Sequence, residues 1–261
     1  MMKTDKTFDI NEARLAHLRW EMALNDIVAG TIQTLDGHED CPLGRWLCGE
    51  AEQVYGDNNS FRVLKVAHKQ FHTLVAGFIN NSNAHYSFNS IEYLDKIDHV
   101  SQQVLFLLTH IELSYNEERG HQKPLFIGRF IGSNRPQDTQ ITSNFATSVG
   151  QARLTHLKWL NELQGALNLG RSLNDIQSDN DCSLGLWLRE NMAADHGISV
   201  GLEALDKAHK NFHKSVQDTV AALHRNDYQA ADDTYSLAYD YSSTIIKHLT
   251  MLELLLGKAF T

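Results

Sequence analysis

Three short segments of this 261-residue chain occur twice, in the same order and about 140 residues apart. The paired segments are 13–20 with 152–159, 40–47 with 181–188, and 67–72 with 208–213. Such repetition predicts two copies of one domain rather than a single large one. We expect the copies over 8–116 and 148–261, joined by a linker over 117–147. Each copy is long enough to bury a core of its own without disulfide bonds.

Both copies show the apolar spacing of amphipathic helices. One stripe at helical spacing consists of Phe61, Leu64, His68, Phe71, Val75 and Phe78, and its counterpart of Leu202, Leu205, His209, Phe212 and Val216. The chain has only three prolines, which permits long helices. We therefore predict an all-α fold made of two tandem antiparallel four-helix bundles related by internal duplication.

The helix boundaries of the first copy are predicted from its apolar stripes and its polar breaks. A first helix is expected over 11–32, followed by a short helix that starts near Cys41. Ser60 is the expected N-cap of the third helix, and the polar run 80–83 is expected to interrupt it. The inward-facing residues expected on the last helix are Leu94, Ile97, Val104, Leu108 and Ile111.

Each copy contains one histidine, one cysteine and then two histidines four residues apart. The two sets are His17, Cys41, His68 and His72, and His156, Cys182, His209 and His213. Residues four apart share one face of a helix, so one helix can supply two ligands to one ion. Three imidazoles and one thiolate complete the tetrahedral ligand set of zinc. The sequence therefore predicts two zinc ions per chain, with no coordination position open for catalysis.

The spacing within the two sets bears on this interpretation. The cysteine precedes the first histidine of the pair by 27 residues in both copies, whereas it follows the upstream histidine by 24 residues in one and 26 in the other. An isolated histidine pair is more often structural, and duplicated domains keep matching residues by descent. Recurrence of the whole set in the same order favours a metal site. The other histidines have no counterpart and are expected in solvated or capping roles: His38, His85, His99, His110, His121, His196, His224 and His248.

The surroundings of the two repeated cysteines predict their chemistry. Each follows an aspartate and stands where a helix is expected to begin, so the positive end of the helix dipole should lower the thiol pKa. Gly44 and Gly185 are expected to let this turn pack closely on a neighbouring helix. Cys48 has no counterpart and is expected to be a semi-buried cysteine, although a resolving thiol is the alternative.

The composition excludes several classes of function. A net charge of −9 argues against binding to nucleic acid or to an anionic membrane surface. The sequence contains no stretch of about 18 apolar residues, so no membrane span is predicted. The N-terminus lacks the apolar core of a signal peptide, so a cytoplasmic location is expected. Nucleotide-binding and hydrolase motifs do not occur in the sequence. Because four protein ligands also leave no open position on the metal, we expect a protein that is not an enzyme.

These residues resemble the chemoreceptor zinc-binding domain. The family pattern is His-x-x-aromatic, then Cys-x-aliphatic-Gly-x-aromatic, then His-x-x-x-His. The first copy is similar at His17 with Trp20, at Cys41 with Leu43, Gly44 and Trp46, and at His68 with His72. The second is similar at His156 with Trp159, at Cys182 with Leu184, Gly185 and Trp187, and at His209 with His213.

The resemblance implies a four-helix bundle that binds zinc through three histidines and one cysteine. It also implies a bacterial sensory role, with zinc or a thiol oxidant such as hypochlorous acid as the signal. Family members mostly accompany a chemoreceptor coiled coil or a diguanylate cyclase, and neither signature is found in this sequence. We therefore expect a signalling protein partner, whose identity the sequence does not give. Pairing of the two repeats within one chain as a pseudo-dimer is a further expectation.

Two alternatives to a sensor remain open at this point. A hemerythrin-like di-iron bundle also uses helical histidine pairs to bind oxygen, but its site requires bridging carboxylates and no thiolate. In the second alternative, zinc serves purely as a structural scaffold for each bundle. Metal identity separates the first alternative from a sensor, and zinc affinity separates the second.

Overall fold

The structure is a computed structural model that describes residues 9–28, 36–83, 90–118, 138–169, 177–192 and 199–259. Over these ranges the ordered elements are all helices, which confirms the predicted all-α class. The chain divides into two compact units between Ser114 and Tyr115. None of the helices in the described ranges is long and apolar enough to cross a membrane.

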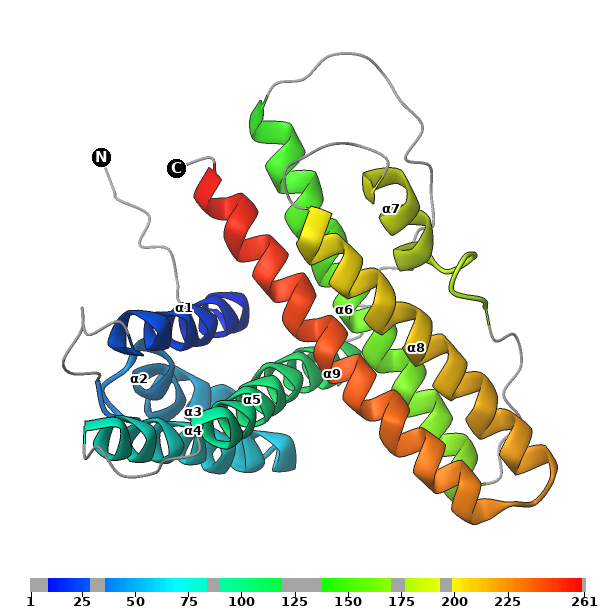
Figure 1. Cartoon of the computed structure of the whole chain (residues 1–261), viewed down its shortest axis with the longest axis horizontal. Coiled ribbons are helices and arrows are strands. Elements are labelled where there is room, and N and C mark those ends of the chain that lie inside the picture. The colour runs from blue at the N-terminus through cyan, green and yellow to red at the C-terminus, as the bar shows by residue number, and fades with distance from the viewer. Residues whose placement is uncertain are drawn as a thin grey trace. The chain divides into compact units, whose positions relative to one another are not determined.

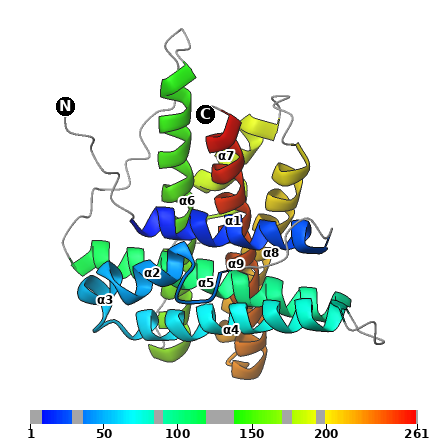
Figure 2. The ribbon, with the colours of Figure 1, turned by 90° about the vertical axis from the view of Figure 1, so that its left-hand side faces the viewer.

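Within its described residues the first unit contains three long helices and two short ones, whose arrangement can be followed in Figures 1 and 2. They are α1 (Ile10–Val28), α2 (Pro42–Cys48), α3 (Glu50–Tyr55), α4 (Asn59–Asn83) and α5 (Ser90–Glu118), whose last residues lie beyond the division between the units. The short helix α2 contacts α1, α3 follows it directly, and α1 contacts α4. Helix α3 has no counterpart among the predicted elements.

The second unit is built on three long helices that lie side by side (Figure 1). They are α6 (Asp138–Leu169), α8 (Ser199–His224) and α9 (Tyr228–Ala259), and the short α7 (Ser183–Met192) packs on α8. Helix α6 begins within the range expected as a linker. Helix α5 ends within the same range, and residues 119–137, which include the apolar segment 126–131, lie outside the described residues.

A tight turn joins α8 to α9 and explains why these helices form a hairpin. Asn226 has a φ of 56°, which asparagine tolerates better than most residues. The Asp227 N–H donates to the carbonyl of Ala222, which satisfies a free carbonyl at the end of α8. The Asp227 carboxylate then accepts from the Ala230 N–H at 3.2 Å and caps α9.

The predicted apolar stripes of α4 and α8 are buried. Phe61, Phe71 and Phe212 are each 0 % exposed, and the two histidines on these stripes are equally enclosed. Leu94 was expected to face the core but is 40 % exposed, so the first of the predicted inward-facing residues that is buried is Ile97.

Two predicted boundaries of α4 are wrong. The N-cap is Asn58 rather than Ser60, because the Asn58 side chain accepts from the Ser60 N–H at 2.8 Å. The polar run 80–83 continues the helix instead of interrupting it. Within that run the Asn81 side chain donates to the Gly77 carbonyl, a bond to the preceding turn that is compatible with continued helix.

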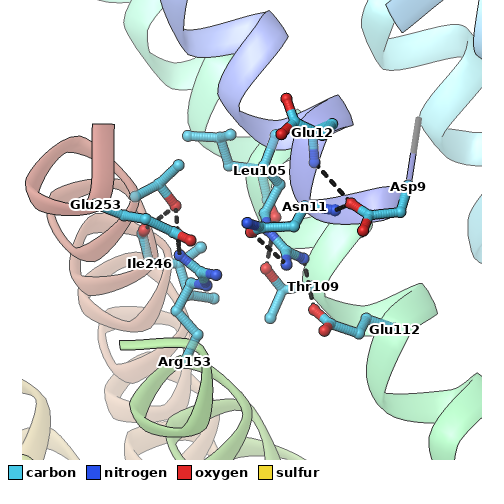
Figure 3. Close-up of polar contacts among 11 residues, drawn as sticks. Asp9, Asn11, Glu12, Leu105, Thr109, Glu112, Arg153, Ile246 and Glu253 are labelled. Carbon is cyan, nitrogen blue, oxygen red and sulfur yellow. Dashed lines mark hydrogen bonds and ion pairs between the residues drawn. The ribbon is translucent and has the colours of Figure 1, made fainter. Parts of the chain in front are cut away.

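Each unit buries an ion pair between its first and last long helices (Figure 3). Arg14 Nη1 lies 2.7 Å from Glu112 Oε2, and Arg153 Nη1 lies 2.6 Å from Glu253 Oε2. Both arginine side chains are at most 2 % exposed, whereas the glutamates are 24 % and 9 % exposed respectively. Arg14 and Arg153 stand three residues before the upstream histidine of each set, so each pair fixes the helix turn that carries that histidine.

Candidate metal centre

In the first copy, three of the four predicted donors lie together. Cys41 Sγ is 3.3 Å from His68 Nε2, and the donor atoms of Cys41, His68 and His72 all lie within 4.8 Å of one another. The fourth, His17, extends from α1 and is buried beside them, with its ring centroid 6.2 Å from that of His68. The fold therefore brings the four side chains to one place, with His17 at the edge of the group.

The second copy repeats this arrangement, but here His213 lies at the edge of the group. Donor atoms of His156, Cys182 and His209 lie within 4.8 Å of one another. Cys182 Sγ is 3.0 Å from His209 Nε2, and His213 Nε2 is 3.1 Å from the same nitrogen. The four side chains thus lie close together in this copy as well, with one histidine on α6 and two on α8. All four are at most 5 % exposed.

The first turn of α2 holds the Cys41 sulfur in place. Cys41 is the N-cap residue, and its Sγ accepts from the Gly44 N–H at 3.2 Å. In α7, Cys182 Sγ likewise accepts from the Gly185 N–H at 3.3 Å. The prediction that a helix begins at each cysteine is confirmed for the described residues.

The glycines of this turn admit a loop carbonyl, and Gly185 also lies close to His209 on the neighbouring helix α8, as predicted. A Cβ atom on Gly44 would stand 1.8 Å from the carbonyl oxygen of His38, and one on Gly185 would stand 1.7 Å from that of Asp179. Each carbonyl belongs to the residue three positions before the cysteine. Glycine is therefore required at these positions because the loop folds back against the turn that presents the sulfur.

A backbone carbonyl orients the second histidine of each pair. His213 Nδ1 lies 3.1 Å from the carbonyl oxygen of Gln177, and since a carbonyl only accepts, Nδ1 carries the proton and Nε2 keeps its lone pair. His72 makes the matching bond to the backbone of Asp36. Outer hydrogen bonds of this type fix the tautomer and ring orientation of a metal-binding histidine.

Burial keeps the clustered histidines neutral. It lowers the pKa of His68 to about 3 and that of His209 to about 4, with the neighbouring histidine of the pair as the next cause. Burial likewise lowers the pKa of His72 to about 4 and that of His156 well below its usual range. A metal ligand must be deprotonated, so these rings hold available lone pairs at neutral pH.

The two thiols behave differently from the prediction. Burial raises the pKa of Cys41 and of Cys182, and the N–H groups of the helix turn only partly oppose it. The expected lowering by the helix N-terminus is therefore wrong for the metal-free protein. Desolvation prevails because each sulfur is enclosed in the core, at 2 % and 5 % exposure, rather than standing at an open helix end.

The donor set suits zinc. Imidazole nitrogens with one thiolate are ligands that zinc accepts in tetrahedral sites, and the described residues place no carboxylate in either group. His156 Nδ1 is buried without a hydrogen-bond partner among these residues, as expected of an atom whose partner is an ion. The same donors do not suit a di-iron centre, which requires bridging carboxylates.

Several residues around these sites were missed from the sequence. His38 was expected in a solvated role, yet its ring centroid lies 6.5 Å from that of His72 and its charge lowers the pKa of that ring. Arg14 and Arg153 are buried and lie inside the repeated segments. An arginine that recurs at a core-facing position in both copies predicts a buried acidic partner. No comparable signal marks His38, because the matching position of the second copy holds Asp179 instead of a histidine.

Comparison with known proteins supports the same conclusion. Residues 17–79 and 156–220 each match the family model of the chemoreceptor zinc-binding domain. Comparison with curated proteins and with solved structures found no match. The two matched ranges begin at His17 and His156 and include all eight predicted donors. The chain therefore belongs to the chemoreceptor zinc-binding domain family, with one copy of the domain in each half.

Proposed function

We propose that the chain is a sensory protein that binds one zinc ion in each copy and signals a change in metal occupancy to a protein partner. The proposed ligands are His17, Cys41, His68 and His72 in the first copy, and His156, Cys182, His209 and His213 in the second. The observation that carries this proposal is the same in both copies: the cysteine sulfur lies within 3.3 Å of the Nε2 atom of the matched histidine.

The metal changes what the buried sulfur can do. Without it, burial keeps Cys41 and Cys182 as thiols, the unreactive form. Bound zinc supplies positive charge that keeps each sulfur as a thiolate. Thiolates are the form that oxidants attack, so the site joins zinc binding to oxidant sensitivity.

The reaction with hypochlorous acid is a two-electron oxidation of sulfur. The thiolate sulfur forms a bond to chlorine as the chlorine–oxygen bond breaks and hydroxide leaves. Water then replaces chloride on the sulfur and releases a proton, so that sulfenic acid and chloride are the products. Sulfenic acid is a poorer ligand than thiolate. The cysteine at the N-cap of α2 or α7 would then no longer bind zinc. The metal would no longer connect that helix to α4 or α8.

Zinc release during oxidation tests the proposal. Zinc-loaded protein is treated with hypochlorous acid in the presence of a chromogenic zinc indicator. We expect the wild type to release zinc, and Cys41→Ser with Cys182→Ser to abolish the oxidant-dependent phase. Cys48→Ser is the matched control, because Cys48 is exposed, and not semi-buried as predicted, and belongs to neither group. Oxidation of Cys41 or Cys182 without zinc release would contradict the proposal.

Metal exchange separates the sensor from a structural scaffold. A sensor site exchanges zinc with a chelator of comparable affinity, whereas a scaffold retains it. We expect the helical circular dichroism to persist after chelation, because each bundle has an apolar core apart from its donors. Iron in the purified protein would favour the di-iron alternative instead.

A further inference from the structure

The first copy contains a chain of hydrogen bonds that leads from a proposed ligand to a carboxylate. His17 Nε2 lies 3.1 Å from the hydroxyl oxygen of Ser101 on α5. The Ser101 hydroxyl in turn donates to Glu21 Oε2 on α1. Ser101 is 0 % exposed and His17 is 2 % exposed, so water does not compete for the bond between them.

Proton accounting then fixes the state of the His17 ring. A serine hydroxyl has one proton, and Ser101 donates it to Glu21. The Ser101 oxygen must therefore accept from His17, which places a proton on Nε2 and leaves the lone pair on Nδ1. A carboxylate linked in this way to the outer nitrogen of a histidine ligand orients the ring and makes the inner nitrogen a stronger donor.

The second copy keeps the serine but lacks the carboxylate. Ser242 occupies the position of Ser101, counted from the matching 108–113 and 249–254 segments, and Leu160 occupies that of Glu21, four residues after the histidine. Leu160 is 1 % exposed. The Ser242 hydroxyl is buried, with no hydrogen-bond partner among the residues that the structure describes. Leu160 therefore supplies no carboxylate that could select the tautomer of His156 through Ser242.

We propose that Glu21, through Ser101, is a positioning residue for the first zinc site, and that the first site consequently binds zinc more tightly than the second. The proposal rests on the proposed zinc-binding function. Removal of an outer partner of a metal-binding histidine typically lowers metal affinity by about 10- to 100-fold. We expect a difference of at least about 10-fold between the two sites for the same reason.

The test uses the full chain with one site disabled at a time. His213→Ala with Cys182→Ser leaves the first site, and His72→Ala with Cys41→Ser leaves the second. Zinc dissociation constants are measured by competition with a chelator of known affinity. In the first background, Glu21→Leu and Ser101→Ala should each weaken zinc binding by about 10-fold or more. In the second, Ser242→Ala should have no effect, and Leu160→Glu should strengthen binding.

Two further readouts separate positioning from a structural role. The melting temperature of the chelated variants reports on the fold alone. The ¹⁵N shifts of the His17 ring report its tautomer, which Glu21→Leu should change and Glu21→Asp should preserve. Equal zinc affinities in the two backgrounds, or a Glu21→Leu variant that folds and binds as tightly as its parent, would overturn this inference alone. Absence of zinc binding in both backgrounds would overturn the proposed function and this inference together.

Discussion

The two copies share their innermost residues and differ in what surrounds them. In both copies the cysteine is the N-cap residue of a helix, and a hydrogen bond to a backbone carbonyl orients the second histidine of the pair. Around these common features, Glu21 in one copy is replaced by Leu160 in the other, and His38 is replaced by Asp179. The comparison teaches that the repeated motif specifies which atoms can bind an ion, whereas unrepeated neighbours specify how each site behaves.

The largest difference expected between the copies concerns the buried ion pairs. Glu253→Gln removes the carboxylate that pairs with the buried Arg153 guanidinium, and breaking a buried pair in this way typically costs about 3–5 kcal/mol. Glu112→Gln should cost less, because Glu112 is 24 % exposed and water already solvates part of its carboxylate in the folded protein, which weakens its pair with Arg14. Urea unfolding of the chelated protein measures both free energies of unfolding.

A matched variant completes this comparison. Arg153→Met with Glu253→Met removes both charges and should recover much of the stability lost in Glu253→Gln. Equal destabilisation by Glu112→Gln and Glu253→Gln would show that the difference in exposure does not govern these pairs.

The glycines at the cysteine turn give the next largest effect. Alanine at Gly44 or Gly185 places a Cβ against a backbone carbonyl, and such overpacking costs about 1–3 kcal/mol. Gly185→Ala should also disturb zinc binding more, since its Cβ would stand 3.2 Å from His209 Cε1. Gly165→Ala is the control, with no atom within 4 Å, and should stabilise its helix slightly. Unchanged zinc content in Gly185→Ala would refute this account of the turn.

Much of this architecture could be predicted from local patterns. The stripe of α4 and the start of α2 at Cys41 follow from spacing and capping rules within a few residues, and the repeat indicates which histidines and cysteines lie close together in each copy. The contacts of His17 with Ser101 and of Ser101 with Glu21 could not be predicted, because each joins residues 80 or more positions apart. Only the packing of α1 on α5 brings them together.

The thiol pKa illustrates the same limit. A helix N-terminus is visible in the sequence and predicts a lowered pKa for Cys41. The depth of burial depends on how α2 packs against the rest of its unit, and that burial reverses the direction. Local rules therefore identified the position of the sulfur correctly and its protonation incorrectly.

The histidines make the stability of the chelated protein depend on pH. Their folded pKa values are depressed, to about 3 for His68 and about 4 for His72 and His209, against about 6.5 when unfolded. Below 6.5 the unfolded chain binds more protons than the folded one, so the free energy of unfolding falls as pH is lowered from about 6.5 to about 4. Each such histidine contributes up to about 1.4 kcal/mol per pH unit. Urea midpoints that stay constant between pH 7 and 5 would contradict this.

The smallest expected effect distinguishes the charges beside the two sites. The charge of His38 lowers the pKa of His72, so His38→Ala should raise it. Asp179 raises the pKa of His209 and His213, so Asp179→Asn should lower both. NMR titration of the chelated protein measures these shifts. Shifts of the same sign in the two variants would show that the neighbouring charges do not act as described.

The number of zinc ions per chain tests the central claim most directly. Native mass spectrometry of protein purified without chelator, supported by elemental analysis, should give two zinc ions for the wild type. It should give one for either His72→Ala or His213→Ala, and none for the double variant. A wild-type chain with a single ion, a different metal, or two ions that survive the double substitution would contradict the account.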